Sequence, residues 1–522
     1  MTVEDQAETV AFLKGEAALL GLPVDTITTH ISTVLMAGDR AFKLKRPVRF
    51  PYLDFSTAER RLAFCEAELV LNRRTAPELY LGVRRITREA DGRLAFDGTG
   101  PLVDAVVEMR RFAQHDLLDD MAQRDALTPA LITDLAHRIV EFHRDAAVSL
   151  DHGGAAGIAA VLDMNDRSLR AVALVSEEAA DALRAAFRSA FERHAPMLEN
   201  RRLTGKVRHC HGDLILRNIC LVDDVPTLFD CIEFDDAIAT IDVLYDLAFL
   251  LMDLWHRDKG DLANLLFNRY LDETDEASSI GALPFLMAIR AAIRAHVTAA
   301  QAGGQPPGKA ARTLVEARAY HDFALSLLAG SDATLLAVGG LSGSGKSTVA
   351  ACVASHLGSP PGARVLNSDR IRKDAFGVSA ETRLPPSAYL PEVSATVYAS
   401  LRDEACQALS SGCAVVADAV FDRPSERASI EATAAKSGVA FQGVWLEAPT
   451  TGLLASRIAD RRDDPSDATA EVLMDQVRRD CGDIDWQHLA AEAKPTMTRD
   501  AILASSPSRG NGRIGSREVE PA

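Results

Sequence analysis

Residues 340–347 read Gly340-Leu341-Ser342-Gly343-Ser344-Gly345-Lys346-Ser347, and this spacing of glycines, Lys and Ser is the phosphate-loop pattern. An apolar run at 335–338 precedes it and a helix-like run at 348–354 follows it, which is the strand, loop and helix context that the pattern requires. The glycines allow backbone N–H groups to converge on phosphate oxygens at the start of the helix. We therefore expect ATP to bind here, with Lys346 on the β- and γ-phosphates and the Ser347 hydroxyl on Mg²⁺. The predicted nucleotide-binding residues are Gly340, Leu341, Ser342, Gly343, Ser344, Gly345, Lys346, Ser347 and Thr348. A glycine-rich turn without a ligand is the alternative.

The length and composition are those of a multidomain protein with a strong acidic balance. The chain has 522 residues, 47% of them hydrophobic, and a formal net charge of -17 at pH 7. The length predicts two or three domains, and the charge argues against general binding to nucleic acid or anionic membranes. The acidic N-terminus lacks a signal-peptide pattern, no run of ~18 apolar residues is evident, and we expect a cytoplasmic protein. The eight cysteines are scattered with no C-x-x-C pair, which indicates reduced thiols and neither zinc nor disulfides.

Two lysines near the N-terminus are candidates for contact with a nucleotide phosphate. Residues 31–44 predict two short strands joined by a tight turn. Lys43 and Lys45 lie two apart on the second strand, so they share a face. The helix predicted over 56–74 carries Glu68, which could pair with one of them. Two solvated lysines on an edge strand are the alternative.

A second constellation lies in the middle of the chain. Residues 211–218 read HGDLILRN, and Asp230 follows on the next predicted strand. This pattern resembles the aminoglycoside phosphotransferase family, small-molecule relatives of protein kinases. The resemblance implies that Asp213 accepts the proton of the substrate hydroxyl, while Asn218 and Asp230 hold Mg²⁺. In the structural alternative, Asp213 only caps a turn and Asp230 only ends a strand.

The resemblance extends to other parts of the first 328 residues. It implies that Lys43 is the strand lysine that positions the α- and β-phosphates and that Glu68 is its partner, with Lys45 as the alternative lysine. Residues 106–109 resemble the hinge whose backbone recognises adenine. One departure is that residues 29–38 contain no glycine-rich phosphate loop.

Long helices are expected between residues 283 and 328, and Arg290 and Arg294 lie one turn apart on the first of them. They could line a substrate cleft. We expect them instead to be surface arginines, because this spacing is common on solvated helix faces.

Two carboxylates follow predicted strands after the phosphate loop. The strand at 364–366 leads into Asp369, with Arg372 one helical turn farther on, and the strand at 414–417 ends in Asp418. Ligands gather at the carboxyl ends of parallel strands, so we expect Asp369 to act as a base, Arg372 to assist it and Asp418 to bind Mg²⁺. A helix-capping Asp369 and a turn residue at Asp418 are the alternatives.

The helix predicted over 453–464 carries Arg457 and Arg461, which could clamp a phosphoryl group or form an exposed basic face. Together with the phosphate loop, this pattern resembles the small P-loop kinases that include gluconate kinase, zeta toxin and the polynucleotide 5′-kinases. No final strand is evident near 494–502, and the polar tail at 501–522 is expected to be disordered.

The sequence thus predicts three segments with two fold classes, α+β and α/β. Residues 1–328 are expected to form a bilobal protein-kinase-like domain, residues 329–500 a P-loop NTPase with a parallel sheet and flanking helices, and residues 501–522 a tail. The expected function is ATP- and Mg²⁺-dependent transfer of a phosphoryl group to a small-molecule hydroxyl at two centres. The alternatives are a regulatory protein in which one domain senses nucleotide, and a nucleic-acid 5′-end kinase in the second half. The sequence identifies neither the acceptor nor the oligomeric state.

Overall fold

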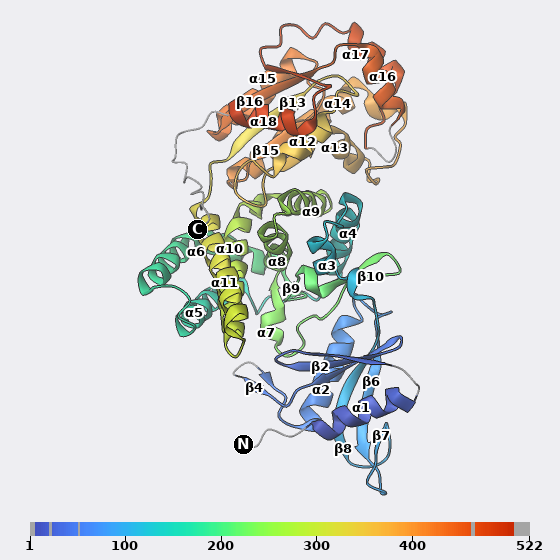
Figure 1. Ribbon diagram of the computed structural model, residues 1–522. Helices are drawn as coiled ribbons and strands as arrows, with labels where there is room; N and C mark the ends of the chain where they lie inside the picture. The colour runs from blue at the N-terminus through green and yellow to red at the C-terminus, as the bar shows by residue number, and fades with distance from the viewer. Residues whose placement is uncertain (1–5, 20–22, 51–52, 461–464, 506–522) are drawn as a thin grey trace, which may run out of the picture. The chain divides into compact units, whose positions relative to one another are not determined.

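The computed structural model describes residues 6–19, 23–50, 53–460 and 465–505. The chain divides into two compact units. The first comprises Met1–Asp275 and Ala282–Ala329, and the second comprises Glu276–Gly281 and Gly330–Ala522. Each unit has its own main sheet and its own hydrophobic core (Figure 1).

The first unit begins with a six-stranded antiparallel sheet in the order β1-β2-β3-β8-β6-β7, flanked by two helices. These elements are α1 (Ala7–Leu19), β1 (Val24–Thr28), β2 (Ser32–Ala37), β3 (Arg40–Lys45), α2 (Ala58–Asn72), β6 (Tyr80–Arg88), β7 (Leu94–Phe96) and β8 (Leu102–Arg110), with the small pair β4 (Arg49–Phe50) and β5 (Leu53–Asp54). The hairpin predicted over 31–44 is confirmed as β2 and β3, which turn at Gly38 with a φ of 59°.

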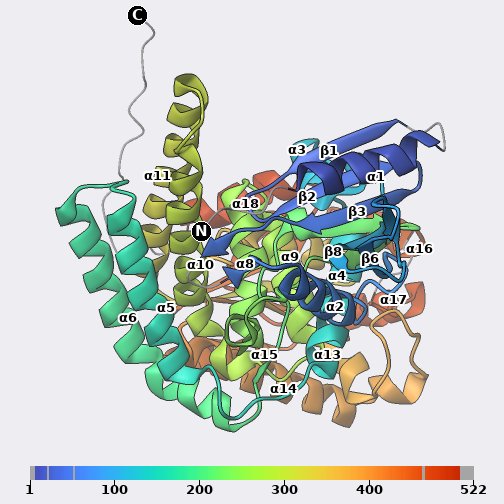
Figure 2. The same cartoon turned by 90° about the horizontal axis from the view of Figure 1, so that it is seen from below.

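The side chains of β3 alternate between two hydrophobic clusters on opposite faces of the sheet. Ala41 belongs to the cluster that includes α2, whereas Leu44 belongs to the cluster that includes α1. Figures 1 and 2 show these two helices on the two sides of the sheet. Because side chains alternate along a strand, Lys43 and Lys45 lie on the same face as Ala41, toward α2.

The remainder of the first unit is mostly helical and is built around α8, an apolar helix that is buried along most of its length. The helices of this part are η1 (Gln114–Asp116), α3 (Leu118–Gln123), α4 (Pro129–Asp145), α5 (Gly154–Ala171), α6 (Glu177–Leu203), η2 (Leu216–Asn218), α7 (Asp236–Ala239), α8 (Val243–His256), α9 (Gly260–Asp272), α10 (Leu283–Ala302) and α11 (Pro307–Ala329). The short helix η3 (Ala277–Ala282) falls almost entirely in the segment Glu276–Gly281, which belongs to the second unit. Two short antiparallel pairs join β9 (Val207–His209) to β12 (Thr240–Asp242) and β10 (Ile219–Val222) to β11 (Val225–Leu228). The kinase-like architecture predicted for this half is confirmed.

One helical stretch, Ala277–Ala302, is long and apolar enough to cross a membrane by length and composition. The prediction that the chain has no run of ~18 apolar residues did not anticipate this stretch. Because 67% of its apolar window is buried inside the protein, we interpret the stretch as a core helix.

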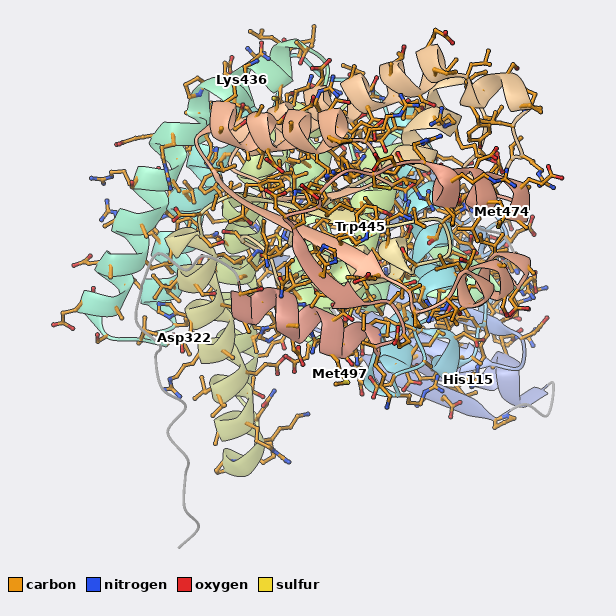
Figure 3. All side chains as sticks on the ribbon, turned by 90° about the horizontal axis from the view of Figure 1, so that it is seen from above. His115, Asp322, Lys436, Trp445, Met474 and Met497 are labelled. Carbon is orange, nitrogen blue, oxygen red and sulfur yellow. The ribbon has the colours of Figure 1, made fainter. Side chains whose placement is uncertain are left out.

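The second unit is a five-stranded parallel sheet in the order β14-β15-β13-β16-β17, as predicted for a P-loop NTPase. Its elements are β13 (Thr334–Gly339), α12 (Lys346–Ala354), β14 (Arg364–Asn367), α13 (Ser368–Ala375), η4 (Pro386–Tyr389), α14 (Pro391–Ser410), β15 (Val415–Asp418), α15 (Pro424–Ser437), β16 (Ala440–Glu447), α16 (Thr451–Ala459), α17 (Ala470–Arg478), β17 (Gln487–Ala490) and α18 (Pro495–Ser505). Figure 3 shows Trp445 of β16 in the middle of this unit, with Lys436, Met474 and Met497 toward its edges on α15, α17 and α18.

The end of the second unit differs from the prediction. The last strand of the sheet is β17, and the stretch near 494–502 forms α18 instead. Ile502 is fully buried in the core of this unit, so the predicted tail boundary at 501 is wrong and the ordered helix continues to Ser505. Residues 506–522 lie outside the described residues.

Candidate functional sites

The phosphate loop runs from the carboxyl end of the central strand β13 into α12. Gly340 has a φ of 141° and Gly343 a φ of 87°, which are conformations that favour glycine. A Cβ on Gly340 would lie 2.7 Å from Ser344 Oγ and 2.8 Å from the Leu446 carbonyl oxygen, and one on Gly343 would lie 2.6 Å from the Leu454 carbonyl oxygen. The loop conformation therefore requires glycine at both positions.

Polar contacts hold the loop in this shape. Lys346 Nζ donates a hydrogen bond to the Leu341 carbonyl at 3.1 Å. The Ser342 amide donates to Gln476 Oε1 of α17 at 2.9 Å, and the buried Ser344 Oγ has no hydrogen-bond partner among the residues that the structure describes. The glycine cradle, the unpartnered hydroxyl and the nearby ammonium fit the phosphates of a nucleotide.

Of the two predicted lid arginines, one lies against this loop. Arg457 on α16 donates to the carbonyls of Gly343 at 3.5 Å and Ala491 at 3.0 Å. Arg461 lies outside the described residues, so its predicted role stays a prediction.

In the second unit, the residues predicted to bind Mg²⁺ are Ser347 and Asp418, and both contact the side-chain amide of Asn367. Asn367 Nδ2 donates to Asp418 Oδ2 at 2.6 Å and to Ser347 Oγ at 3.3 Å. Hydroxyl and carboxylate oxygens are ligands that Mg²⁺ accepts, so these side chains fit the ion. The Asn367 side chain also caps α13 by accepting from the amides of Asp369 and Arg370, so the alternative in which Asp369 is the cap is wrong.

The candidate base Asp369 lies on the first turn of α13, close to the groups that would face the phosphates. Burial raises the pKa of Asp369; the Asp418 carboxylate acts in the same direction, against the opposing charges of Lys346 and Arg372. Arg372 is buried, and its guanidinium lies 4.8 Å from the centre of the Tyr389 ring. The candidate base Asp369 therefore lies near Lys346, the predicted phosphate lysine, and near Asp418, the predicted metal ligand.

In the first unit, both candidate lysines contact carboxylates. Lys43 Nζ lies 2.7 Å from Glu68 Oε1 and 2.5 Å from Asp230 Oδ1. Lys45 Nζ lies 2.7 Å from Glu68 Oε2 and also pairs with Glu233. Burial alone would raise the pKa of Asp230, but the Lys43 ammonium lowers it, so the carboxylate is kept ionised. The alternative of two solvated lysines is therefore wrong.

Asp213 is oriented by two neighbours from its own loop. Asn218 Nδ2 donates to the Asp213 carbonyl and to Asp213 Oδ2, both at 2.9 Å. Arg217 donates to Asp213 Oδ2 at 3.2 Å. Burial would raise the pKa of Asp213, but Arg217 and other nearby cations lower it, so the group is a carboxylate at neutral pH.

The loop that carries Asp213 is anchored by Asp246 of α8. The amides of His211 and Gly212 donate to the two carboxylate oxygens of Asp246 at 3.1 and 2.9 Å. The buried His143 of α4 contacts the same carboxylate at 3.2 Å. These hydrogen bonds brace the loop that carries Asp213 against α8 and α4.

Residues 29–32 form a closed turn at the position where the family resemblance would place a glycine-rich phosphate loop. The Thr29 amide donates to the Ser32 carbonyl at 2.8 Å, and Arg46 donates to the carbonyls of Thr29 at 2.8 Å and His30 at 3.2 Å. Burial lowers the pKa of His30, and the positive charges of Arg217 and Arg46 add to this effect. The two hydrogen bonds from Arg46 hold this turn closed.

Comparisons with known proteins agree with this division of the chain. Residues 55–279 match the phosphotransferase enzyme family, and residues 335–479 match an AAA domain. An uncharacterized protein of Mycobacterium tuberculosis is 30% identical over 458 residues, which cover 86% of this chain and 88% of that protein, and a Mycobacterium bovis protein matches equally. The chain belongs to the family of these mycobacterial proteins. It is a fusion of an aminoglycoside phosphotransferase-like domain with a P-loop kinase-like domain.

Two solved structures each match part of this fusion protein. A choline/ethanolamine kinase family protein from Mesorhizobium loti is 15% identical with a TM-score of 0.37, covering 61% of this chain and 99% of that chain. A gluconokinase from Sinorhizobium meliloti 1021 is 20% identical with a TM-score of 0.23, covering 33% of this chain and 90% of that chain.

The structure contradicts the hinge predicted at residues 106–109 of this fusion protein. Residues 106–109 lie inside β8, where they pair with β3 on one side and β6 on the other. Their backbone groups serve the sheet and cannot recognise adenine. The prediction was wrong because an apolar run indicates a central strand as readily as the segment that follows one.

The position of Arg290 contradicts the expectation that it is a surface arginine. Its side chain is buried beneath the loop that carries Asp213, where it donates to the carbonyls of Gly212 at 3.2 Å and Tyr245 at 3.1 Å. The guanidinium also stacks 3.7 Å from the centre of the Tyr245 ring. The surface position predicted for Arg290 is therefore wrong, and Arg294, one turn on, is only half-buried.

We expect Arg290→Met to lower the free energy of unfolding of the first unit by about 1–3 kcal/mol, because it removes charge-assisted hydrogen bonds to two carbonyls. Arg294→Met is the matched control and should cost about 1 kcal/mol or less. Hydrogen exchange of peptides from α8 and α10 in the full chain measures both changes. Equal protection in the two variants would contradict the anchoring role of Arg290.

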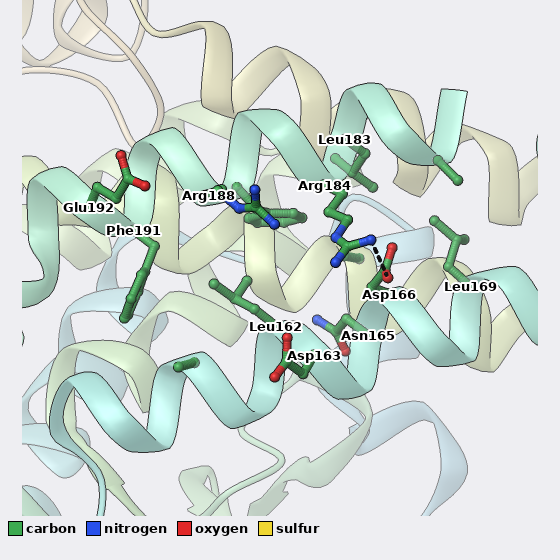
Figure 4. A pocket seen from close by; sticks show the side chains of 14 residues that line it. Leu162, Asp163, Asn165, Asp166, Leu169, Leu183, Arg184, Arg188, Phe191 and Glu192 are labelled. Atoms are coloured by element: carbon green, nitrogen blue, oxygen red, sulfur yellow. Dashed lines mark ion pairs between the residues drawn. The ribbon is translucent and has the colours of Figure 1, made fainter. Parts of the chain in front are cut away.

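A separate cavity of about 340 Å³ lies between α5 and α6 (Figure 4). Arg184 of α6 and Asp166 of α5 form an ion pair of 3.8 Å at its side. None of the predicted site residues of either unit is among the described residues that line it. The cavity therefore belongs to neither candidate centre.

Proposed function

We propose that this fusion protein is an ATP-dependent phosphotransferase with two phosphoryl-transfer centres, one in each unit, that act on hydroxyl groups of small molecules. The observation that carries the proposal is that each unit brings together a lysine, oxygen-bearing side chains and a further carboxylate, which are the groups that phosphoryl transfer needs. Membership in two kinase-type families supports the same reaction class. A sensor that only bound nucleotide would need no base.

In the first centre, Lys43 binds the α- and β-phosphates and Asn218 and Asp230 hold Mg²⁺. Asp213 Oδ accepts the proton of the acceptor hydroxyl. At the same time, the hydroxyl oxygen forms a bond to the γ-phosphorus of ATP, and the bond between that phosphorus and the ADP oxygen breaks. The lowered pKa of Asp213 keeps it ready to accept that proton. Asp246 and Arg290 keep its loop in position.

In the second centre, the phosphate-loop amides and Lys346 bind the β- and γ-phosphates, and Ser347 and Asp418 hold Mg²⁺. Asp369 accepts the proton of the acceptor hydroxyl, and Arg372 and Arg457 stabilise charge around the transferred group. When bound, Mg²⁺ neutralises phosphate charge in both centres.

We place the functional boundary between the two centres at residues 328 and 329, and we propose that each half acts on its own small-molecule substrate in the cytoplasm. The net charge of -17 supports substrates other than nucleic acid and argues against a membrane surface.

The test is an acceptor screen on the full chain and on two variants that each leave one centre intact. Lys346→Ala leaves the first centre, and Asp213→Asn leaves the second. Each protein is incubated with γ-labelled ATP and with sugars, amino sugars, aminoglycosides and 5′-hydroxyl oligonucleotides, and label on the acceptor is measured. We expect labelled small molecules from the full chain, with each product lost in only one variant.

Label on oligonucleotides alone would favour a nucleic-acid end kinase. Absence of transfer together with undiminished nucleotide binding in both units would favour the regulatory alternative over two transfer centres.

A further inference from the structure

Glu68 of α2 accepts hydrogen bonds from two lysines at once. Lys43 Nζ lies 2.7 Å from Oε1, and Lys45 Nζ lies 2.7 Å from Oε2. The Glu68 side chain is fully buried, and the Lys45 side chain is 1% exposed. Both lysines reach one carboxylate because they share the face of β3 that packs toward α2. The single lysine–glutamate pair implied by the family resemblance is therefore a bridge of three residues.

Each lysine also contacts a carboxylate that follows β11. Lys43 contacts Asp230, and Lys45 contacts Glu233, three residues farther along the chain. The Asp230 side chain is 42% exposed, whereas that of Glu233 is 5% exposed. The end of the network at Asp230, the predicted metal ligand, is therefore exposed to solvent. The end at Lys45 and Glu233 is buried.

The two ends of the network differ in what they can do when nucleotide binds. Lys43 and Asp230 form an ion pair, and both have a predicted role toward phosphate or Mg²⁺. If Lys43 turns toward phosphate, Glu68 would lose one partner in a buried site, which is strongly unfavourable for a carboxylate without another cation. Lys45 remains in place to keep Glu68 paired.

The charge state of Lys45 agrees with a permanent structural contact. Burial alone would lower the pKa of Lys45, but the carboxylates of Glu233 and Glu68 raise it above its usual value. The Lys45 ammonium is already paired with two buried carboxylates, so it is not available to bind a nucleotide phosphate. Its position favours Lys43 over Lys45 as the phosphate lysine.

We propose that Lys45 is a positioning residue that fixes Glu68 and, through Glu233, the turn that presents Asp230 to Mg²⁺. The inference rests on the proposed function of the first centre and resolves the choice between Lys43 and Lys45. Lys43 exchanges partners when nucleotide binds, whereas Lys45 does not. Loss of the Lys45–Glu233 contact should therefore act on the Mg²⁺ requirement more than on affinity for the phosphates.

The test uses the full chain carrying Lys346→Ala, so that the second unit does not contribute binding. Into this parent are introduced Lys43→Met, Glu233→Gln and the double change Lys45→Met with Glu233→Gln. The double variant removes one positive and one negative charge, so it preserves the net charge of the network, and Glu68 keeps Lys43 as a partner before nucleotide binds. Calorimetric titration with a non-hydrolysable ATP analogue over a series of Mg²⁺ concentrations gives the nucleotide affinity and the Mg²⁺ requirement. Hydrogen exchange of residues 229–235 without nucleotide reports on the turn.

We expect Lys43→Met to weaken nucleotide binding at saturating Mg²⁺ by about 10–100-fold, as for loss of a charge-assisted contact. Glu233→Gln and the double variant should bind nucleotide at saturating Mg²⁺ but need about 10–100-fold more Mg²⁺, the usual effect of losing a residue that orients a metal ligand. Both should also exchange faster at residues 229–235.

A matched control is the other buried ion pair of α2, in which Arg61 Nε lies 2.7 Å from Asp104 Oδ1 of β8 and both side chains are 1% exposed. The double change Arg61→Met with Asp104→Asn should leave the Mg²⁺ requirement within about twofold, because Phe55, Val103 and Ala105, which this pair contacts in the described part of the chain, lie outside residues 229–235.

A double variant of Lys45 and Glu233 with the Mg²⁺ requirement and exchange rate of the parent would overturn the inference. So would a Lys43→Met variant that binds nucleotide as the parent does. A parent that binds no nucleotide would instead contradict the proposed function of the first centre, and exchange at residues 229–235 would still decide whether Lys45 and Glu233 anchor the turn.

Discussion

Replacing Lys346 with Ala should weaken binding of a Mg²⁺-bound ATP analogue to the second unit by about 10–100-fold, and it should slow phosphoryl transfer there by ~10²–10³-fold. Lys346 Nζ donates to the Leu341 carbonyl of its own loop, so it lies beside the glycine-rich turn that would hold the phosphates. Its loss removes a positive charge from the place where negative charge accumulates in the transition state.

The control for Lys346→Ala is Lys436→Ala, which removes the same charge from an exposed position on α15 of the same unit. Calorimetric titration should give the wild-type affinity for the control. Equal affinities for Lys346→Ala and Lys436→Ala would show that the loop does not bind phosphate.

Replacing Asp213 with Asn should slow transfer in the first centre by ~10²–10⁴-fold while nucleotide affinity changes little, because the amide preserves the shape of the side chain and cannot accept the proton. The assay uses the Lys346→Ala background and an acceptor from the screen, so that the second centre does not mask the loss. Asp134→Asn, at an exposed position on α4, is the matched control and should transfer at the parent rate.

The pH dependence of the first centre adds a second readout on Asp213. Because nearby cations lower the pKa of Asp213, the carboxylate stays ionised as pH falls through the usual range of aspartate, near ~4. Titration of this group should therefore not reduce the rate between about pH 8 and pH 5. A wild-type rate in Asp213→Asn would contradict the assignment of Asp213 as the base at any pH.

Local patterns predicted much of the fold correctly. The phosphate loop needs glycine at two positions with positive φ, and the β2–β3 hairpin turns at Gly38, so both could be found from residue type and spacing. The strand that ends in Asp418 was visible as an apolar run bounded by a carboxylate.

Other elements could not be predicted because short patterns are ambiguous. The apolar residues of 495–505 are concentrated at 501–504, and the helix is stabilised by packing of Ile502 into the core of the second unit. Residues 106–109 gave an apolar run that fits a central strand equally well, and only the neighbouring strands decide between the two readings.

The missed site residues act across long separations in sequence. Gln476 reaches the Ser342 amide 134 positions away, and Arg290 reaches the Gly212 carbonyl 78 positions away. Neither belongs to a local motif, and a single Arg or Gln on a helix is usually exposed. Asn367 could have been suspected, since Asn at the junction of a strand and a helix is a favoured cap.

The central claim is that one chain carries two separate nucleotide-binding centres. Calorimetric titration of the full chain with a non-hydrolysable ATP analogue and Mg²⁺ measures it most directly through the number of sites per chain. We expect two sites for the wild-type chain, one for Lys346→Ala, one for Lys43→Met and none for the double variant in the same concentration range. A single site in the wild-type chain that disappears in Lys346→Ala alone would contradict the claim that the first unit is a phosphotransferase centre.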